Sequence, residues 1–134
     1  MDKIISAEKM RQLEQLVFSL GVDSFAVMEK AALRIADAVM ERFPKHKKIV
    51  AVCGKGNNGG DGFAAARMLL QCGYRVCICL PFGEPLTQDA LKNFEIVKKL
   101  GIETVSTDSL GEFDVIIDAL FGTGLSLLKS KRVI

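Results

Sequence analysis

Hydrophobic positions follow two different periods along the chain, and the change between them separates two regions. Up to residue 43, apolar residues recur three to four positions apart. This spacing predicts one helix from Ser6 to about Leu20 and a second from Asp23 to about Phe43. The apolar stripe of the second helix is wide, as in a heavily buried helix. Pro44 follows, and because proline disfavours helical backbone in the residue before it, we expect the helix to end there.

Beyond Pro44, short apolar runs alternate with helical patterns. Strands are predicted at residues 49–53, 75–80, 103–106 and 114–120, and helices at 61–72 and 87–100. The run Val115-Ile116-Ile117 is apolar throughout, which is typical of a strand buried on both faces. We therefore predict an α/β fold over a single domain, residues 1–134. It is a Rossmann-like, doubly wound, mainly parallel sheet with two additional N-terminal helices.

The composition is that of a globular protein with a sizeable core, since 49% of the residues are hydrophobic. A net charge of +2 gives no electrostatic case for nucleic acid or an acidic membrane as a partner. The four cysteines contain no Cys-x-x-Cys pair, which favours buried free thiols over a zinc site. Free thiols indicate a reducing, cytoplasmic compartment. The sequence leaves the oligomeric state open, including a homo-oligomer.

A glycine-rich loop follows the first predicted strand and precedes a helical pattern. Five glycines fall between Gly54 and Gly62. Glycine lets the backbone turn tightly and approach a ligand, and the start of a helix presents unpaired N–H groups to an anion. The loop also contains Asn57, Asn58 and Asp61, which a simple phosphate cradle does not need.

Two common nucleotide motifs do not account for this loop. Gly54-x-Gly56-x-x-Gly59 formally matches the dinucleotide fingerprint, but the second predicted strand ends in Leu80-Pro81-Phe82-Gly83 without a ribose-binding acid. A Walker loop is also excluded, because no Gly-Lys-Ser/Thr follows. We expect a phosphate-bearing ligand at a site that differs from a standard NAD or ATP site.

A second polar, glycine-containing loop follows the fourth predicted strand. It runs from Asp118 to Ser126 and reads Asp-Ala-Leu-Phe-Gly-Thr-Gly-Leu-Ser. In doubly wound sheets, ligands bind beyond the carboxyl ends of the strands, where the strand order reverses. The two loops are therefore expected to form opposite walls of one crevice.

Together, the segments Asn57–Gly62 and Asp118–Ser126 resemble the NAD(P)H-hydrate epimerase family, also called the YjeF N-terminal domain. The stretches Gly21–Asp23 and Met28–Ala31 are similar to the opening helices of that family. The resemblance implies an isomerase of metabolite repair that interconverts the S and R forms of NADHX and NADPHX, the hydrated reduced cofactors. It also implies a dehydratase partner, separate or fused.

The resemblance further implies roles for individual residues. Substrate contacts are expected at Asn57, Asn58, Gly59, Gly60 and Asp61, and at Gly122, Thr123, Gly124, Leu125 and Ser126 closing over the phosphates. A potassium ion (K+) is expected on Asn58 and Asp118. An amide oxygen and a carboxylate are hard donors that suit such a cation. No catalytic residue is identified.

Each of these positions also has a purely structural interpretation. Asp61 suits a helix cap or a first-turn acid that complements the helix dipole. Asp118 can be an ordinary polar strand end, and Asn57 and Asn58 can occupy left-handed turn positions. The hydroxyls of the second loop, at positions 123 and 126, suit turns or caps equally well.

The sequence departs from the family pattern near its end. Leu127 and Leu128 follow Ser126, where the family usually has a basic residue. The family's later strands and its Val-Asp-Ile-Pro-Ser-Gly-like segment, which supplies a third part of the site, do not follow. We therefore expect an N-terminal portion of the domain, weakly active or inactive, whose fourth strand lacks its next neighbour and exposes an apolar edge. A non-catalytic nucleotide-binding or protein-interaction scaffold of the same fold is the alternative function.

Overall fold

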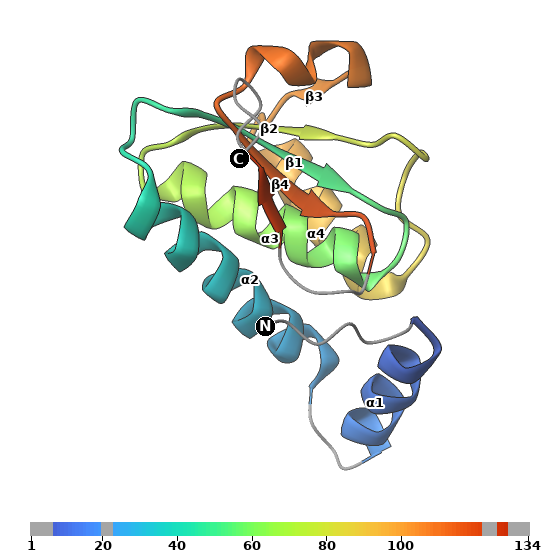
Figure 1. The fold of residues 1–134 in the computed structure, drawn as a ribbon. Helices are drawn as coiled ribbons and strands as arrows, with labels where there is room; N and C mark the ends of the chain where they lie inside the picture. The colour runs from blue at the N-terminus through green and yellow to red at the C-terminus, as the bar shows by residue number, and fades with distance from the viewer. Residues whose placement is uncertain (1–6, 20–22, 122–125, 129–134) are drawn as a thin grey trace.

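A five-stranded sheet with helices packed against it makes up the fold (Figure 1). The computed structural model describes residues 7–19, 23–121 and 126–128. In chain order the elements are α1 (Ala7–Ser19), α2 (Ser24–Arg42), β1 (Lys48–Cys53), α3 (Asn57–Gln71), β2 (Arg75–Cys79), α4 (Gln88–Lys99), β3 (Thr104–Val105), the 3-10 helix η1 (Thr107–Glu112), β4 (Val115–Ala119) and β5 (Ser126–Leu128).

The strands lie in the order β3-β2-β1-β4-β5. The first four strands of this order are parallel, and β5 runs antiparallel to β4. From β1 the chain moves outward to β2 and β3, then returns to place β4 on the other side of β1. The strand order therefore reverses between β1 and β4, which is where ligands bind in sheets of this type. The predicted Rossmann-like, mainly parallel α/β fold is confirmed.

The core lies mainly between the sheet and three helices. Ile49, Ala51 and Cys53 of β1 face α2, α3 and α4, which lie on one side of the sheet (Figure 1). On that side the rings of Phe63 and Phe94 join α3 to α4, with centroids 5.3 Å apart. Alternate residues of β1 belong to a smaller cluster on the other face, because side chains alternate along a strand. Both faces of β1 are therefore buried. In β4, for which the apolar run predicted the same, Val115 and Ile117 are buried but Ile116 on the other face is only half-buried.

Two helices begin next to the residues that the sequence predicted as their starts, and the side chains of these residues cap them. The side chain of Asp23 accepts a hydrogen bond from the Phe25 N–H at 3.0 Å, and Thr87 Oγ1 accepts one from the Ala90 N–H at 3.3 Å. These bonds satisfy N–H groups that have no partner within the first turn. α2 ends at Arg42, just before Pro44. Ser6, the predicted start of the first helix, lies outside the described residues.

The C-terminal edge of the sheet differs from the prediction. Ser126–Leu128 form β5 and pair antiparallel with β4, so the expectation that the fourth strand lacks a neighbour was wrong. A three-residue strand is too short to produce a recognisable period of two. The predicted third strand is also shorter, and only Thr104 and Val105 pair with β2.

The four cysteines are free thiols, but burial was expected for all of them and only two are fully buried. Cys53 and Cys79 are buried, Cys77 is half-buried and Cys72 is exposed. The one tyrosine, Tyr74, is buried and donates a hydrogen bond to the Phe43 carbonyl at 2.6 Å. Among the described residues, no helix is long and apolar enough to cross a membrane.

Candidate functional site

The glycine-rich segment after β1 enters the helix earlier than the sequence predicted. We expected the helix to begin at Asp61, but α3 begins at Asn57, with Gly56 as its N-cap. The Gly56 carbonyl accepts hydrogen bonds from the N–H groups of Gly59 at 3.1 Å and Gly60 at 3.4 Å. Helix propensity alone does not reveal this start, because glycine is a poor helix former. Tertiary contacts here override that low propensity. The first turn of α3 therefore presents its N-terminal end directly above β1.

Two of the glycines allow close contact between backbone segments. A Cβ at Gly59 would collide with the carbonyl of Gly54, and a Cβ at Gly54 would collide with the carbonyl of Leu120. The Gly54 N–H also donates to the Ala119 carbonyl at 3.0 Å. The loop after β1 is thus packed against itself and against the end of β4. Only glycine permits this arrangement, because any Cβ would overlap backbone atoms.

Two further glycines let α3 lie close to its neighbours. A Cβ at Gly62 would lie 2.7 Å from both the Ala119 Cβ and the Cys53 Sγ. A Cβ at Gly60 would lie 2.5 Å from the methyl carbon of Met28. Both glycines are buried. Their spacing places the helix start over the β1 and β4 ends, and it explains why the segment contains more glycines than a turn requires.

Asp118 lies at the end of β4, beside the loop that follows β1. It is paired in register with Val52 of β1 on one side and with Ser126 of β5 on the other. One carboxylate oxygen, Oδ1, accepts a hydrogen bond from the Leu120 N–H at 3.1 Å. Among the described residues, no lysine or arginine forms an ion pair with this carboxylate. Asp118 therefore carries a half-buried negative charge at the switch point.

The structure removes three of the structural interpretations considered from the sequence. Asp61 is the fifth residue of α3, and the first turn contains no acidic residue, so Asp61 is neither the cap nor a first-turn acid. No non-glycine residue among those described has a positive φ, so Asn57 and Asn58 do not occupy left-handed turn positions. Both asparagines lie in the first turn of α3, at the same strand edge as Asp118.

The second predicted loop is only partly described. Gly122, Thr123, Gly124 and Leu125 lie outside the described residues, so their expected contacts with substrate phosphates stay predictions. Ser126 lies within β5, in register with Asp118. A strand position replaces the turn or cap that was considered for it.

Cys53 lies beneath the site, at the last position of β1. Burial raises its pKa well above the usual value for a thiol, and electrostatic interactions with Cys79 and Asp61 add smaller contributions. Cys53 itself is a protonated core residue, and we assign it no chemical role.

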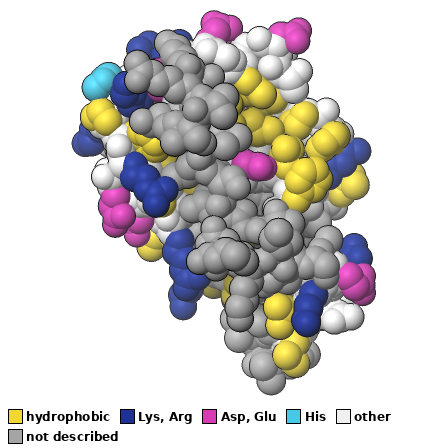
Figure 2. Space-filling model, viewed as in Figure 1, with side chains coloured by type: hydrophobic (Ala, Val, Ile, Leu, Met, Phe, Trp, Pro, Cys, Tyr) yellow, Lys and Arg dark blue, Asp and Glu magenta, His cyan; other side chains and the backbone are white. Residues whose placement is uncertain are grey.

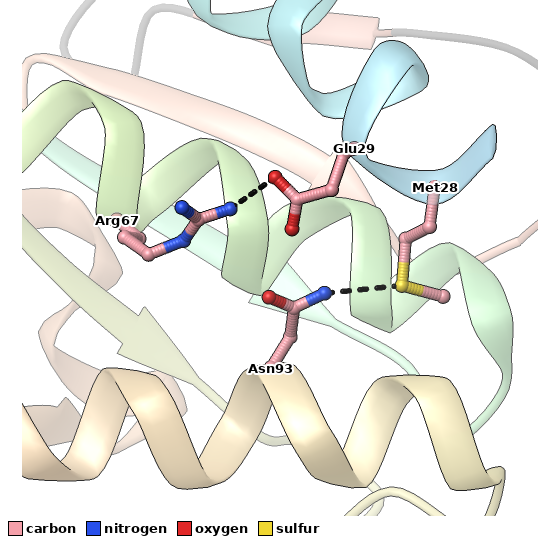
Figure 3. A network of polar contacts seen from close by, with 4 residues as sticks. All are labelled: Met28, Glu29, Arg67 and Asn93. Atoms are coloured by element: carbon pink, nitrogen blue, oxygen red, sulfur yellow. Dashed lines mark hydrogen bonds and ion pairs between the residues drawn. The ribbon is translucent and has the colours of Figure 1, made fainter. Parts of the chain in front are cut away.

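A polar cluster lies between α2, α3 and α4 (Figure 3). Asn93 of α4 is fully buried, and its Nδ2 donates to the Met28 Sδ at 3.2 Å. The methyl group of Met28 occupies the space that the missing side chain of Gly60 leaves. Arg67 of α3 pairs with Glu29 of α2. These contacts join three helices under the glycine loop and hold its first turn in place.

The donor set fits a monovalent cation. Asn58 and Asp118 offer an amide oxygen and a carboxylate oxygen, both hard donors, from neighbouring structural elements. Asp118 Oδ2 accepts no hydrogen bond from a described residue, so one oxygen of the half-buried carboxylate keeps its capacity for a ligand. The chemistry of the residues present is therefore consistent with the potassium site that the sequence resemblance implied.

Sequence reasoning missed three residues at this edge of the sheet. Lys55 is exposed in the glycine loop, and its carbonyl accepts a hydrogen bond from the Leu86 N–H at 2.8 Å. Phe82 and Phe121, which follow β2 and β4, place their ring centroids 6.5 Å apart. For the two phenylalanines the sequence held a signal, since each is an aromatic residue just beyond the end of a buried strand. Residues in such loops are normally polar, because they are exposed to water.

The chain matches the family described as YjeF-related protein N-terminus over residues 24–133. It is 40% identical over 130 residues to the bifunctional NAD(P)H-hydrate repair enzyme Nnr of Synechocystis sp., covering 93% of this chain and 24% of the relative. It is 38% identical over 131 residues to the NAD(P)H-hydrate epimerase of Limosilactobacillus reuteri, covering 92% of this chain and 60% of the relative. The chain therefore spans about a quarter of the first relative and less than two thirds of the second.

The fold is also similar to a solved structure. The crystal structure of the yeast protein ynu0 (YNL200c) superposes with a TM-score of 0.74 at 26% sequence identity, covering 90% of this chain and 57% of that one. From the fold, the paired loop and strand end, and these similarities, the chain belongs to the family of YjeF-related protein N-terminal domains.

Proposed function

We propose that this chain acts in the repair of damaged nicotinamide cofactors by epimerising the S and R forms of NADHX and NADPHX. The observation that carries the proposal is the contact between the glycine loop and the end of β4. The Gly54 N–H donates to the Ala119 carbonyl at 3.0 Å, directly beside Asp118. This contact brings the loop that leads into α3 next to the Asp118 carboxylate at the switch point. A helix start suits an anion, and this supports a diphosphate-carrying nucleotide as the ligand. Relatives named NAD(P)H-hydrate epimerase support the choice of substrate.

The proposed reaction requires general acid–base chemistry at one carbon. The hydroxyl group to be inverted is bonded to a carbon next to the ring nitrogen. When an acid protonates the hydroxyl, the carbon–oxygen bond breaks, water leaves, and the nitrogen lone pair forms an iminium. Water then adds to the opposite face and releases a proton to a base, which restores the charge balance. A carboxyl group can serve as donor and acceptor, and the candidates are Asp61 in α3 and Asp118 at the end of β4.

The residues of this chain would bind and position the substrate around that carbon. The first turn of α3, with Asn57 and Asn58, offers helix N–H groups and amide side chains to the diphosphate. Lys55 supplies a positive charge in the same loop. A potassium ion held by Asn58 and Asp118 would offset part of the diphosphate charge. We propose the contacts of Gly59, Gly60 and Asp61 with substrate on the same basis.

A coupled assay tests this function. The chain is incubated in potassium buffer with the epimer that an NAD(P)HX dehydratase does not accept, together with excess dehydratase, and absorbance of the reduced cofactor is followed. We expect formation faster than the spontaneous rate, and a loss of at least tenfold in Asp118→Asn, whose neutral amide removes the charge at the switch point. Asp108→Asn, an exposed acid on η1, is the matched control and should keep full activity.

The assay has outcomes that count against the proposal. A rate equal to the spontaneous one would remove the catalytic assignment. Equal losses in the two asparagine variants would show a general charge effect. Replacing potassium with sodium tests the cation site separately from the epimerase function. A rate that is unchanged in sodium would contradict the potassium site but not the epimerisation. The bifunctional relatives also support a dehydratase as functional partner, fused or separate.

A further inference from the structure

Two exposed phenylalanines stand on either side of β1 at the carboxyl edge of the sheet. Phe82 follows β2 and Phe121 follows β4, the two strands that flank β1. Their ring centroids are 6.5 Å apart, with planes inclined by 48°. The side chains are 55% and 60% exposed. Among residues whose side chains the structure describes, they are the only exposed aromatic ones. The pair therefore spans the strand whose end carries the glycine loop.

The position of Phe82 is set by contacts between its loop and the glycine loop. The Leu86 N–H donates to the Lys55 carbonyl at 2.8 Å, and the Gly83 N–H donates to the Leu80 carbonyl at 3.1 Å. Gly83 has a φ of +102°, a backbone conformation that residues with side chains rarely adopt. A Cβ added at Gly83 would contact the side chain of Lys55. The turn is therefore specified by its backbone, and it holds Phe82 beside the phosphate-binding segment.

Exposed aromatic pairs contribute little to folding, because their ring faces remain in water. Figure 2 shows hydrophobic side chains gathered on the side toward which β1, β2 and β4 run. Such grouping of apolar surface next to a polar site is typical of a binding surface. The neighbouring features favour a ligand with a phosphate, since Lys55 and the start of α3 both suit an anion. A ligand with an anionic group and a flat aromatic face matches both halves of this surface.

We propose that Phe82 and Phe121 form a stacking platform for the adenine base of the bound nucleotide. This inference rests on the proposed function, since it assigns the base of the same ligand. Adenine is the fully aromatic ring of NADHX, whereas the hydrated nicotinamide ring has lost its aromaticity. Base–aromatic stacking needs only a π-face and buries apolar surface on both partners. The platform would place the diphosphate over the glycine loop.

Calorimetry with ADP and with inorganic pyrophosphate tests the platform, because the two probes differ by the nucleoside. Phe82→Leu and Phe121→Leu keep an apolar side chain and remove the ring. We expect each to weaken ADP binding at least fivefold, in line with the measured worth of base stacking, and to leave pyrophosphate binding within twofold of the unsubstituted chain. Leu86→Ala is the matched control, since Leu86 is exposed in the same loop but has no ring. It should bind both probes normally.

The adenine H2 and H8 resonances of ADP give an independent readout, because stacking on a ring moves them upfield. We expect that shift with the unsubstituted chain and its reduction in both leucine variants. Unaltered ADP affinity in these variants would overturn the platform, as would an equal loss for pyrophosphate or no ADP binding by the unsubstituted chain. Light scattering adds a further outcome: a dimer that the leucine variants dissociate would assign the ring pair to self-association. Base stacking without any epimerisation would instead refute the proposed function and leave the platform standing.

Discussion

At the scale of single residues, the site is organised by positions that lack a side chain. Gly54 and Gly59 pack backbone against backbone, while Gly60 and Gly62 admit Met28, Cys53 and Ala119 from neighbouring elements. Each contact is closer than a Cβ allows. The loop therefore derives its shape from backbone contacts.

Gly59→Ala should unfold or distort this loop. The new methyl group would overlap the Gly54 carbonyl, which is backbone and cannot move aside as a side chain would. We expect a loss of about 1–3 kcal/mol in unfolding free energy, the usual cost of overpacking, measured by urea denaturation. Gly56→Ser is the control, because a Cβ there meets nothing within 4 Å and serine is a preferred N-cap residue. Equal losses in both variants would show that the steric argument is mistaken.

At the scale of elements, α2, α3 and α4 are joined by polar contacts inside an otherwise apolar layer. Arg67 and Glu29 form an ion pair whose side chains are only 19% and 27% exposed. Asn93 bonds Met28 beside them (Figure 3). These contacts require the helices to meet in one register, since the ion pair and the hydrogen bond each join two different helices. The start of α3 is thereby held at a defined height over β1.

Glu29→Gln tests the contribution of the ion pair between α2 and α3 to stability. The substitution leaves the charge of Arg67 largely shielded from water and without its carboxylate, so we expect a loss of about 1–2 kcal/mol in unfolding free energy. Glu95→Gln breaks a matched ion pair with Lys98 at 2.8 Å, in which both side chains are about half exposed. Thermal and urea unfolding should show no measurable change for that control. If the two variants behave alike, burial of the Glu29–Arg67 pair does not matter for stability.

At the scale of the whole molecule, the sheet has two buried faces of unequal size. Cys53 belongs to the large cluster under the helices, and Cys79 belongs to the smaller cluster on the other face. Burial raises the pKa of both thiols, so both are protonated at neutral pH as well as shielded. The thiolate is the reactive form, which makes both residues poor nucleophiles in the folded state. Cys72 is exposed at the end of α3.

Alkylation at neutral pH measures whether the two faces unfold as one unit. In variants that keep one cysteine each, we expect Cys72 to react at nearly the rate of a model thiol. Cys53 and Cys79 should react only through global unfolding, with equal protection that matches the urea-derived free energy. Faster reaction of Cys79 than of Cys53 would show that the small face opens independently.

Above pH 9, the free energy of unfolding should fall, because the thiols of the unfolded chain ionise there while the buried thiols, with raised pKa, stay protonated.

The sequence by itself determined the elements and their order. Alternation of apolar runs with helical patterns predicted the parallel α/β fold, and Asp23 and Thr87 predicted two helix starts, because capping is a local interaction. The motifs at Asn57–Gly62 and Asp118–Ser126 indicate the family without any knowledge of tertiary contacts. These features depend on residues close together in the chain, so a linear pattern carries them.

Only the tertiary structure decided how the site is assembled. The helix begins at Asn57 instead of the predicted Asp61, since contacts with β4 and α2 override the low helix propensity of glycine. The tertiary structure also paired β5 with β4, and it brought Phe82 and Phe121 together across β1, although they are far apart in sequence. The physical reason is shared: each depends on which strands become neighbours, and strand order arises from packing over the whole chain.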